Sequence, residues 1–317
     1  MLAATIEGLR RALPGLATIT IAGGERNKTR QAKSRLEDDL LSLGAGRDTV
    51  LIALGGGVVT DLAGFTAGTY LRGVPWVAMP TTLVGMVDAA LGGKTGVNTP
   101  QGKNLVGLFH PPTGVVSLLE TLATLPATHF RCGLAECLKH GLTMDAAHFE
   151  WVAGRDPRSL RRRADEIRTL VMASASLKCA VVEEDPRETT GRRNILNVGH
   201  TVGHALEKLS GFAMPHGEAV AAGLCWEAAA AVADGLLDRN DLPRVTSAVA
   251  RLGFSQAWRA TEPAAILEAA RTDKKNRAGA VAYVPLGGIG RPALPPPHTA
   301  PLGLESLEAG LRLLVEV

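Results

Sequence analysis

Hydrophobic and polar positions recur with helical spacing in two early segments and with strand spacing in two others. Residues 4–13 and 28–43 have the helical period, and the second of these segments ends at Gly44-Ala45-Gly46. Residues 17–22, ATITIA, alternate around β-branched side chains, whereas residues 49–54, TVLIAL, form a continuous apolar run typical of a buried parallel strand. The order strand, helix, strand predicts a right-handed crossover unit.

A glycine-rich turn follows this apolar run. Gly55, Gly56 and Gly57 are consecutive, and a helical pattern begins at about Thr60. Glycines let backbone amides approach a phosphate, and the N-terminus of a helix supplies the positive end of its dipole. Because the spacing is not GxGxxG, the turn predicts either a dinucleotide site or a plain tight turn.

Basic and amide side chains lie among glycines in residues 81–112, after a short predicted strand at residues 76–80. The segment has too few apolar positions for a core strand, so it is expected to be a loop. Lysines on glycine-rich loops are natural partners of phosphate or carboxylate groups. Lys94 and Lys103, together with Asn104, therefore predict an anion site. The alternative is a pair of solvent-exposed lysines on a flexible loop.

Helical periodicity dominates the chain after Pro126. A last strand and turn over residues 115–126 end the first domain, so two domains are expected, residues 1–126 and 127–317. The predicted helices of the second domain cover residues 130–144, 157–184, 199–210, 217–235, 241–252, 263–271 and 304–316, with a short strand at 280–286. The pattern predicts an α/β first domain and a mainly α-helical second domain.

Composition and charge narrow the class of protein. With 317 residues, 46% hydrophobic and 21% charged, the chain can bury a sizeable core. The net charge of +3 is spread along the chain, and the one dense basic run, residues 158–163, is expected to be a solvated helix face rather than a nucleic-acid surface. Four cysteines without CxxC spacing suggest reduced thiols in a cytoplasmic protein. No stretch approaches the roughly 20 apolar residues of a membrane span, and no signal peptide is evident at the N-terminus.

Three histidines lie within a short stretch of small, apolar residues. His200 and His204 are four apart, so on a helix both imidazoles leave the same face. His216 follows in a Met-Pro-His-Gly turn that could bring a third imidazole toward them. Three protein ligands with an open position are typical of catalytic zinc, but spacing alone leaves open which donors bind. Hydrogen-bonded core or surface histidines are the alternative.

A glutamate lies within the apolar helical segment 130–144. Glu136 and Lys139 are three apart and share a helix face, and His140 is close to both. A glutamate buried in such a helix costs several kcal/mol unless it is paired or bound to a metal. An ordinary surface ion pair is the alternative.

Nine sequence blocks, in order from Gly23 to Gly279, resemble the 3-dehydroquinate synthase family of sugar-phosphate cyclases. The blocks are GGERNKT, GGGVVTDLAGF, YLRG, MPTTLVGMVDAALGGKTGVNTPQGKN, GLAECLKHG, SLKCAVVEED, GRRNILNVGHTVGHALE, MPHGEAV and DKKNRAG. The resemblance implies an N-terminal Rossmann-like NAD-binding domain, a mainly α-helical C-terminal domain that holds a zinc or cobalt ion, and a homodimer acting on a small sugar phosphate.

The resemblance also implies roles for individual residues. The metal ligands fall on Glu136, His200 and His216, so His204 becomes a phosphate-side or proton-relay residue. Implied catalytic residues are Asp88, Lys94, Lys139, Lys178, Asn197 and His204. Implied substrate contacts are Arg72, which would reach the neighbouring subunit's site, Lys103, Asn104, Arg193 and Lys274, preferred over Lys275. Implied NAD contacts are Glu25, Lys28, Gly56, Gly57, Asp61, Thr81, Thr82, Lys94 and Lys103.

The implied reaction converts 3-deoxy-D-arabino-heptulosonate 7-phosphate to 3-dehydroquinate and phosphate. It proceeds by NAD-dependent transient oxidation, phosphate elimination, reduction and aldol cyclisation. The rivals are a 2-epi-5-epi-valiolone or 2-deoxy-scyllo-inosose synthase, a glycerol-dehydrogenase-like oxidoreductase, and a non-catalytic paralogue. Family members usually have about one more strand-helix-strand before GGERNKT. This chain is therefore expected to bind NAD more weakly than a version extended upstream. It is also expected to expose a sheet edge at residues 17–22.

Overall fold

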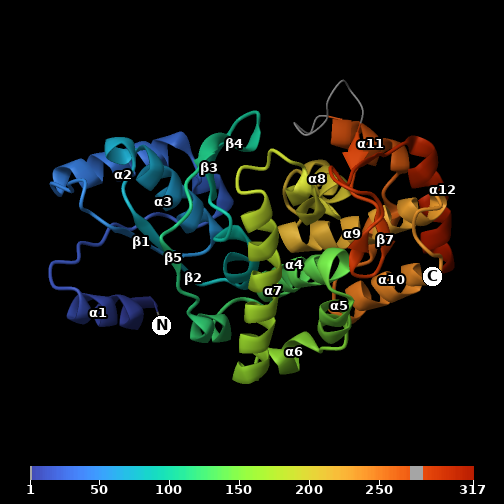
Figure 1. The fold of residues 1–317 in the computed structure, drawn as a ribbon, viewed down its shortest axis with the longest axis horizontal. Helices are drawn as coiled ribbons and strands as arrows, with labels where there is room; N and C mark the ends of the chain where they lie inside the picture. The colour runs from blue at the N-terminus through green and yellow to red at the C-terminus, as the bar shows by residue number, and fades with distance from the viewer. Residues whose placement is uncertain (1, 272–280) are drawn as a thin grey trace. The chain divides into compact units, whose positions relative to one another are not determined.

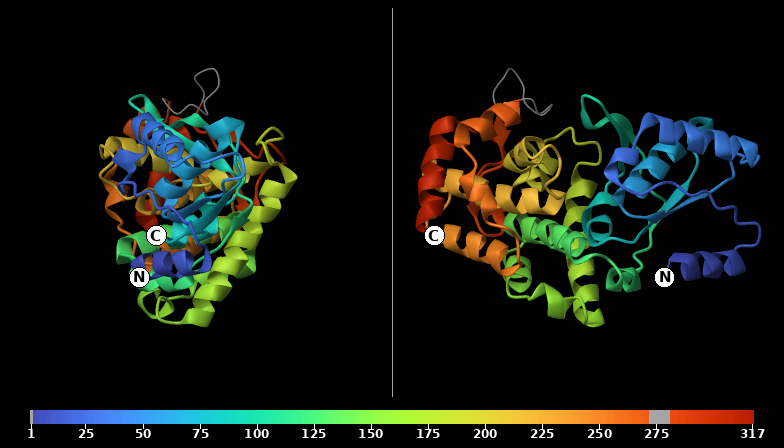
Figure 2. Two further views of the ribbon diagram at one scale, coloured as in Figure 1. Left: turned by 90° about the vertical axis from the view of Figure 1, so that its left-hand side faces the viewer. Right: turned by 180° about the vertical axis from the view of Figure 1, so that it is seen from behind.

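The computed structural model describes residues 2–271 and 281–317. They divide into two compact units, Met1–Pro126 and Ala127–Val317, called unit 1 and unit 2 below. Unit 1 has a parallel sheet with helices, and unit 2 is mainly helical (Figures 1 and 2). The predicted fold class, an α/β Rossmann-like part followed by a mainly α-helical part, is confirmed.

The sheet of unit 1 has the strand order β1-β2-β5. Strands β1 (Leu51–Gly55) and β2 (Trp76–Pro80) are parallel and are joined by helix α3 (Gly57–Thr69). This arrangement places the N-terminus of α3 at the carboxyl end of β1. The other elements of unit 1 are α1 (Leu2–Ala12), η1 (Glu25–Asn27), α2 (Arg30–Ser42), η2 (Tyr70–Arg72), η3 (Gly85–Ala89), β3 (Lys94–Thr99), β4 (Gly102–Phe109), β5 (Gly114–Val115) and η4 (Leu119–Ala123).

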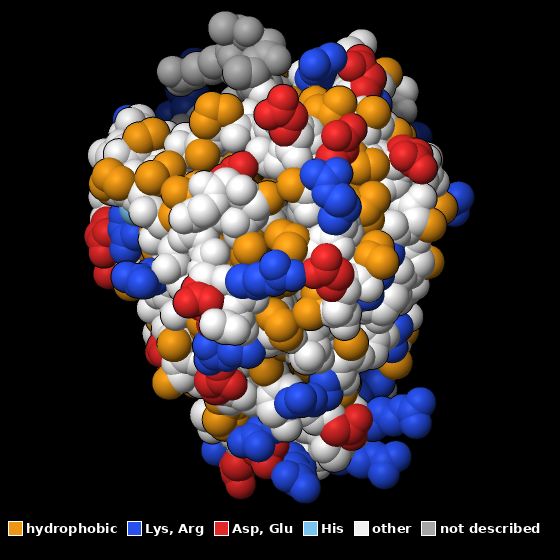
Figure 3. All heavy atoms as spheres, turned by 90° about the vertical axis from the view of Figure 1, so that its right-hand side faces the viewer, with side chains coloured by type: hydrophobic (Ala, Val, Ile, Leu, Met, Phe, Trp, Pro, Cys, Tyr) orange, Lys and Arg blue, Asp and Glu red, His pale blue; other side chains and the backbone are white. Residues whose placement is uncertain are grey.

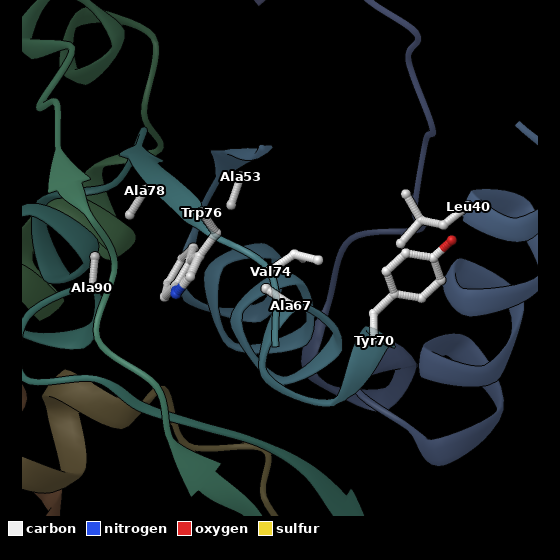
Figure 4. Packing of buried hydrophobic residues seen from close by; sticks show 8 residues of the cluster. All are labelled: Leu40, Ala53, Ala67, Tyr70, Val74, Trp76, Ala78 and Ala90. Atoms are coloured by element: carbon white, nitrogen blue, oxygen red, sulfur yellow. The ribbon is translucent and has the colours of Figure 1, made fainter. Parts of the chain in front are cut away.

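A buried cluster fixes α3 against this sheet (Figure 4). Trp76 of β2 is 2% exposed, and its indole N–H donates to the His110 carbonyl at 3.1 Å. At the other end of the cluster, Tyr70 lies beside Leu40 and donates its hydroxyl to the Ala45 carbonyl at 2.7 Å. The buried apolar side chains and the two hydrogen bonds together stabilise one packing arrangement of α3 on the sheet.

The strand predicted at residues 17–22 is wrong, and so is the exposed sheet edge expected there. In the described part of the chain this segment belongs to no helix and no strand. Ile19 and Ile21 instead pack against buried clusters of unit 1. Alternation of β-branched residues marks which side chains pack inward, but a strand also requires a neighbouring backbone, which the pattern does not reveal.

The loop predicted across residues 81–112 is also wrong in part, because it contains an antiparallel hairpin. Strands β3 and β4 pair with Lys94 opposite Phe109 and Val97 opposite Val106. A side chain at Gly96 would place its Cβ 2.7 Å from the Val106 carbonyl oxygen. The glycines thus permit close approach of the two strands, whereas their number in the sequence suggested a loop.

Unit 2 is built around α9 (His216–Ala233), which is buried along most of its length. Its alanines and glycines let neighbouring helices approach closely. A Cβ at Gly310 of α12 (Leu304–Glu316) would lie 3.1 Å from the Ala230 amide nitrogen. The other elements of unit 2 are α4 (Ala127–Met144), α5 (Ala146–Ala153), α6 (Pro157–Leu160), α7 (Ala164–Glu184), η5 (Arg192–Asn197), α8 (His200–Leu209), α10 (Asp241–Arg251), η6 (Ala257–Ala260), α11 (Pro263–Arg271), β6 (Ala282–Tyr283), β7 (Leu286–Gly288), β8 (Arg291–Pro292) and β9 (Ala300–Pro301).

Most helices of unit 2 agree with the prediction within a few residues. There are two differences: α5 was not predicted, and the helix predicted over residues 157–184 is divided into α6 and α7. Asp156 caps α6 by accepting from the Ser159 amide at 2.8 Å, with Pro157 at the first helical position. This short capped turn ends before α7 begins.

The described surface carries charges of both signs, and the four cysteines form no disulfide. Lys and Arg side chains lie among Asp and Glu side chains over one face of the molecule (Figure 3). Cys132, Cys137, Cys179 and Cys225 are free thiols, as predicted. Every described helix is too short or too polar to cross a membrane.

Candidate active site

Glu136 is at the centre of the candidate metal site in unit 2. It lies on α4 and is fully buried, and its Oε2 is 2.5 Å from Nζ of Lys139, which is 1% exposed. The predicted shared helix face of these two residues is therefore a buried ion pair rather than a surface pair. The ammonium group of Lys139 compensates part of the free-energy cost of burying this carboxylate.

Two imidazoles face the other oxygen of this carboxylate. The Nε2 atoms of His216 and His200 lie 3.1 Å and 3.8 Å from Oε1 of Glu136. Among the described residues, Glu136, His200 and His216 form the group that could hold a metal ion, with one ligand atom from each within 4.8 Å of the others. His204 is adjacent but outside this group, with its ring centroid 5.4 Å from that of His200.

The Nδ1 atoms of both histidines point to acceptors. Nδ1 of His200 lies 3.1 Å from the Val198 carbonyl oxygen, which can only accept, so the proton of a neutral imidazole is on Nδ1. Nδ1 of His216 is 3.6 Å from Oε1 of Glu207, a glutamate on α8 that is 4% exposed. Metal-binding histidines commonly have such partners on the other ring nitrogen.

Close helix crossings bring the three ligands together. A Cβ at Gly217 would lie 2.2 Å from Cα of Cys132, so α9 begins almost in backbone contact with α4. Glu136 is one helical turn beyond Cys132, which places its side chain next to His216. A Cβ at Gly223 would lie 1.9 Å from the carbonyl oxygen of Gly199, so the start of α8 touches α9 in the same way.

The two histidines have opposite pKa shifts. Burial and then the charge of Lys139 hold the pKa of His200 well below its usual value of 6.5, which keeps the ring neutral. For His216, burial lowers the pKa, but hydrogen bonds to Glu136 and Glu207 outweigh it and raise the pKa to about 10. Glu136 and Glu207 therefore favour positive charge at His216, which a metal ion can supply in place of the proton.

Further cations are buried in unit 2. Lys178 of α7 is 6% exposed and Arg193 of η5 is 1% exposed. Arg193 donates from Nη1 to the Pro186 carbonyl at 3.1 Å, and its backbone N–H donates to Asp185 at 3.3 Å. Asn197 ends the same turn, η5. Lys274 and Lys275 lie outside the described residues.

The glycine-rich turn in unit 1 has the geometry expected of an anion site at a helix N-terminus. Gly56 is the N-cap of α3, and no side chain caps the helix there. A Cβ at Gly56 would lie 3.1 Å from Cγ2 of Thr82, and the Thr81 amide donates to the Gly55 carbonyl at 2.9 Å. The turn is thus fixed against the end of β2, with backbone amides at the helix start.

Several predicted cofactor residues contact one another. Lys28, 3% exposed, donates from Nζ to the carboxylate of Asp61 and to Oδ1 of Asn104, the latter at 2.5 Å. Asn98 donates to Oε1 of Glu25 at 2.8 Å. These bonds connect the GGERNKT segment to α3 and to the β3–β4 hairpin.

The remaining predicted residues of unit 1 are more accessible. Asp88 is partly buried in the π-helical turn η3, a type of turn that is frequent at functional sites. Lys94 is exposed and Lys103 is partly exposed, both on hairpin strands. Arg72 is exposed and has a left-handed backbone, with φ 70°.

Sequence reasoning missed two glutamates of the site, Glu207 and Glu227. Glu207 is three residues after His204, and the apolar surroundings of both glutamates could have marked them as buried and therefore paired. The partner of each lies on the other of the two helices α8 and α9, which sequence spacing does not show.

Comparison with known proteins identifies the family. Residues 18–132 match the family model described as 3-dehydroquinate synthase N-terminal, and residues 133–276 match the C-terminal model of the same family. The chain belongs to the 3-dehydroquinate synthase family. A 3-dehydroquinate synthase of Pelobacter propionicus is 42% identical over 86% of this chain and 76% of its own length. One of Halorhodospira halophila is 43% identical over 89% and 80%.

Solved structures of other cyclases share the fold. A 2-deoxy-scyllo-inosose synthase with carbaglucose-6-phosphate, NAD+ and Co2+ has 27% identity and a TM-score of 0.86. The alignment covers 98% of this chain and 87% of the synthase chain. The 2-epi-5-epi-valiolone synthase of Streptomyces hygroscopicus with NAD+ and Zn2+ has 29% identity, covers 99% and 89%, and has the same TM-score of 0.86. A probable glycerol dehydrogenase of Sinorhizobium meliloti, at 17% identity and a TM-score of 0.60, shows a likeness of fold alone.

Proposed function

We propose that this protein is a 3-dehydroquinate synthase, a carbon-oxygen lyase that converts 3-deoxy-D-arabino-heptulosonate 7-phosphate to 3-dehydroquinate and phosphate. The observation that carries the proposal is the group formed by Glu136, His200 and His216, whose ligand atoms lie within 4.8 Å of one another in a chain of this family. Relatives that carry this name are 42% and 43% identical over most of the chain.

The donors of this group suit zinc or cobalt. One carboxylate oxygen and two imidazole nitrogens are ligands that both ions accept. Three protein ligands are also the number in catalytic zinc sites, where water or substrate completes the coordination. When bound, such an ion acts as a Lewis acid toward substrate hydroxyl groups, and NAD takes a hydride from the substrate and returns it.

Residues of unit 2 would bind the substrate and hold protons. Lys139 holds Oε2 of Glu136 through their 2.5 Å ion pair, so that Oε1 stays available on the side of the imidazoles. Arg193 and Lys178 would bind the carboxylate and phosphate of the substrate, with Asn197 as a hydrogen-bond partner, and this binding would orient the reacting carbons. His204, beside His200, would move a proton on the phosphate side.

Residues of unit 1 would bind NAD. The backbone amides at Gly56 and Gly57 and the N-terminus of α3 would receive its diphosphate. Thr81, Thr82 and Asp88 would border the nicotinamide end. Hydrogen bonds of Glu25, Lys28 and Asp61 connect the GGERNKT segment to α3 and to the hairpin. These residues would border the adenosine end of NAD. Further contacts with substrate and cofactor stay predictions for Lys94, Lys103, Asn104, Arg72 and Lys274. The homodimer and the cytoplasmic location also stay predictions.

The test is an assay of the purified protein with heptulosonate phosphate, NAD and zinc. Phosphate release that matches substrate consumption, without net NADH, and that stops when a chelator removes the metal would support the proposal. Net accumulation of NADH would indicate a dehydrogenase. Turnover of a neutral sugar phosphate in place of heptulosonate phosphate would indicate another cyclase, and NAD binding without any turnover would indicate a non-catalytic paralogue.

A further inference from the structure

A buried carboxylate outside the ligand group caps the helix that begins with His200. Glu227 of α9 is 2% exposed. Its Oε2 accepts a hydrogen bond from the backbone N–H of Gly199 at 2.8 Å, and its Oε1 accepts one from that of Val202 at 3.0 Å. One side chain on α9 therefore satisfies two of the backbone donors at the start of α8.

The usual local cap is impossible at this helix start. The N-cap residue, Gly199, has a left-handed backbone with φ 76° and offers no side-chain acceptor. A Cβ at this position would lie 2.8 Å from Cδ2 of Leu224, which is one turn before Glu227 on α9. Since serine, threonine or aspartate would collide there, the acceptor has to come from another helix.

The two hydrogen bonds of Glu227 lie on either side of His200 in the chain. Gly199 and Val202 flank His200 in the chain, so Glu227 fixes the backbone on both sides of it. The Val198 carbonyl, which belongs to the same turn, accepts from Nδ1 of His200 at 3.1 Å. When the backbone of this turn is fixed, the orientation of the His200 imidazole is fixed as well, with Nε2 directed toward Glu136.

The negative charge of Glu227 also favours its position at the start of α8. The N-terminus of a helix carries partial positive charge, and two charge-assisted hydrogen bonds compensate much of the cost of burying a carboxylate. Glu227 reaches this site because α8 and α9 are in near backbone contact, with a Cβ at Gly223 only 1.9 Å from the Gly199 carbonyl oxygen.

We propose that Glu227 is a positioning residue of the metal centre, which fixes the start of α8 so that Nε2 of His200 is in place before the metal arrives. The inference rests on the metal site of the proposed function. It assigns Glu227 no contact with metal, substrate or NAD. Its effect should therefore be seen in metal affinity and in the geometry at the metal, and not only in turnover.

The test compares Glu227→Gln with the wild-type protein in chelator-competition titrations of Zn2+ and in the visible spectrum of the Co2+ form. The amide has one accepting oxygen, so one of the two backbone N–H groups loses its partner. The dissociation constant should rise by about 10- to 100-fold, as for other residues that orient metal ligands, and the Co2+ spectrum should shift.

Asp234→Asn is the matched control. Asp234, at the other end of α9, also accepts two hydrogen bonds from other elements, from Tyr283 at 2.7 Å and from Ser306 at 2.6 Å. Its loss should lower the unfolding temperature but leave metal affinity unchanged. Equal weakening of metal binding by both substitutions would show a general effect of destabilisation and overturn the inference, as would wild-type affinity and spectrum in Glu227→Gln.

Residue-level hydrogen exchange on the metal-free wild-type protein gives an answer even if Glu227→Gln does not fold. Slow exchange at the amides of Gly199 and Val202 is expected, because both are held before metal binds. Fast exchange at both amides would refute the inference. Wild-type protein that binds neither Zn2+ nor Co2+ would instead count against the metal site of the proposed function.

Discussion

At the scale of single residues, two histidines of similar sequence context have different electrostatic surroundings. Burial and then the nearby Lys139 ammonium lower the pKa of His200, and the Val198 carbonyl accepts from its Nδ1. His216 lies between two carboxylates, and its pKa is raised to about 10. Both rings nevertheless direct Nε2 toward the same oxygen of Glu136, and what holds Nδ1 decides this orientation in each case.

Glu207 should therefore be required for tight metal binding. Glu207→Gln removes the charged partner of Nδ1 in His216, and the metal dissociation constant should rise by about 10-fold or more. Chelator competition with Zn2+ measures this change. Glu218→Gln is the control, because Glu218 is two residues from His216 but contacts Arg131 at 3.4 Å and the Ser255 amide at 3.1 Å. Equal effects of the two substitutions would contradict the assigned role.

The sequence predicts some of these residues and not others. The helical spacing of an apolar segment placed Glu136 and Lys139 on one helix face, but it left open whether the pair is buried or lies on the surface. The four-residue spacing of His200 and His204 was not enough to exclude His204 from the ligand group, because both lie on one helix face. That choice depends on where α4 and α9 approach α8, which is a matter of tertiary packing.

At the scale of elements, helices were easier to predict than strands. Helices of unit 2 have local hydrogen bonds, so most of their bounds follow from the sequence. Strands of unit 1 depend on distant partners. The β3–β4 hairpin contains glycines such as Gly107, where a Cβ would lie 1.9 Å from the Thr95 carbonyl oxygen. In this hairpin glycine indicates close strand packing rather than a turn.

The contact between α5 and α7 should make stability depend on pH. His148 is buried, with Nε2 2.9 Å from the Ser174 hydroxyl oxygen. Burial lowers its pKa below 6.5, against smaller opposite effects of Asp145 and of a backbone hydrogen bond to Cys137. Below about pH 6.5 the unfolded chain then binds a proton that the folded protein does not, so stability falls as the pH falls, by at most about 1.4 kcal/mol per pH unit.

Denaturant unfolding of wild type and His148→Gln between about pH 5 and 7.5 tests this linkage. Glutamine can keep a hydrogen bond to Ser174 but does not titrate. The free-energy difference between the two proteins should therefore shrink as the pH falls through the ordinary histidine range. A difference that is the same at every pH would show that the folded protein does not hold this imidazole neutral.

At the scale of the whole molecule, the proposed roles divide between the two units. The glycine-rich turn proposed to bind phosphate and the hairpin belong to unit 1, whereas the proposed metal ligands and the buried cations Lys178 and Arg193 belong to unit 2. Through their resemblance to the family, the sequence blocks implied this division of roles. They could not show the hydrogen bonds between helices that fix the metal ligands, since those partners are far apart in the chain.

Substrate recognition by Arg193 should be separable from cofactor binding. Arg193→Lys keeps the charge but loses the planar guanidinium that can bind a carboxylate or phosphate through two hydrogen bonds. The kcat/KM for heptulosonate phosphate should fall by about 10- to 100-fold, the effect of roughly 1.5 to 3 kcal/mol from one charged hydrogen bond. NAD affinity, measured by fluorescence titration, should stay unchanged, because the proposed NAD contacts belong to unit 1.

Arg192→Lys is the matched control for this substitution. Arg192 is the neighbouring residue, and its Nε donates to Glu184 at 2.5 Å on a more exposed part of the surface. Its replacement should leave kcat/KM close to the wild-type value. Arg193→Lys should also affect a neutral sugar phosphate less than heptulosonate phosphate, because the neutral substrate lacks the carboxylate. If both arginine variants lose activity equally, or if Arg193→Lys weakens NAD binding as much as substrate use, Arg193 does not recognise the substrate in the way proposed.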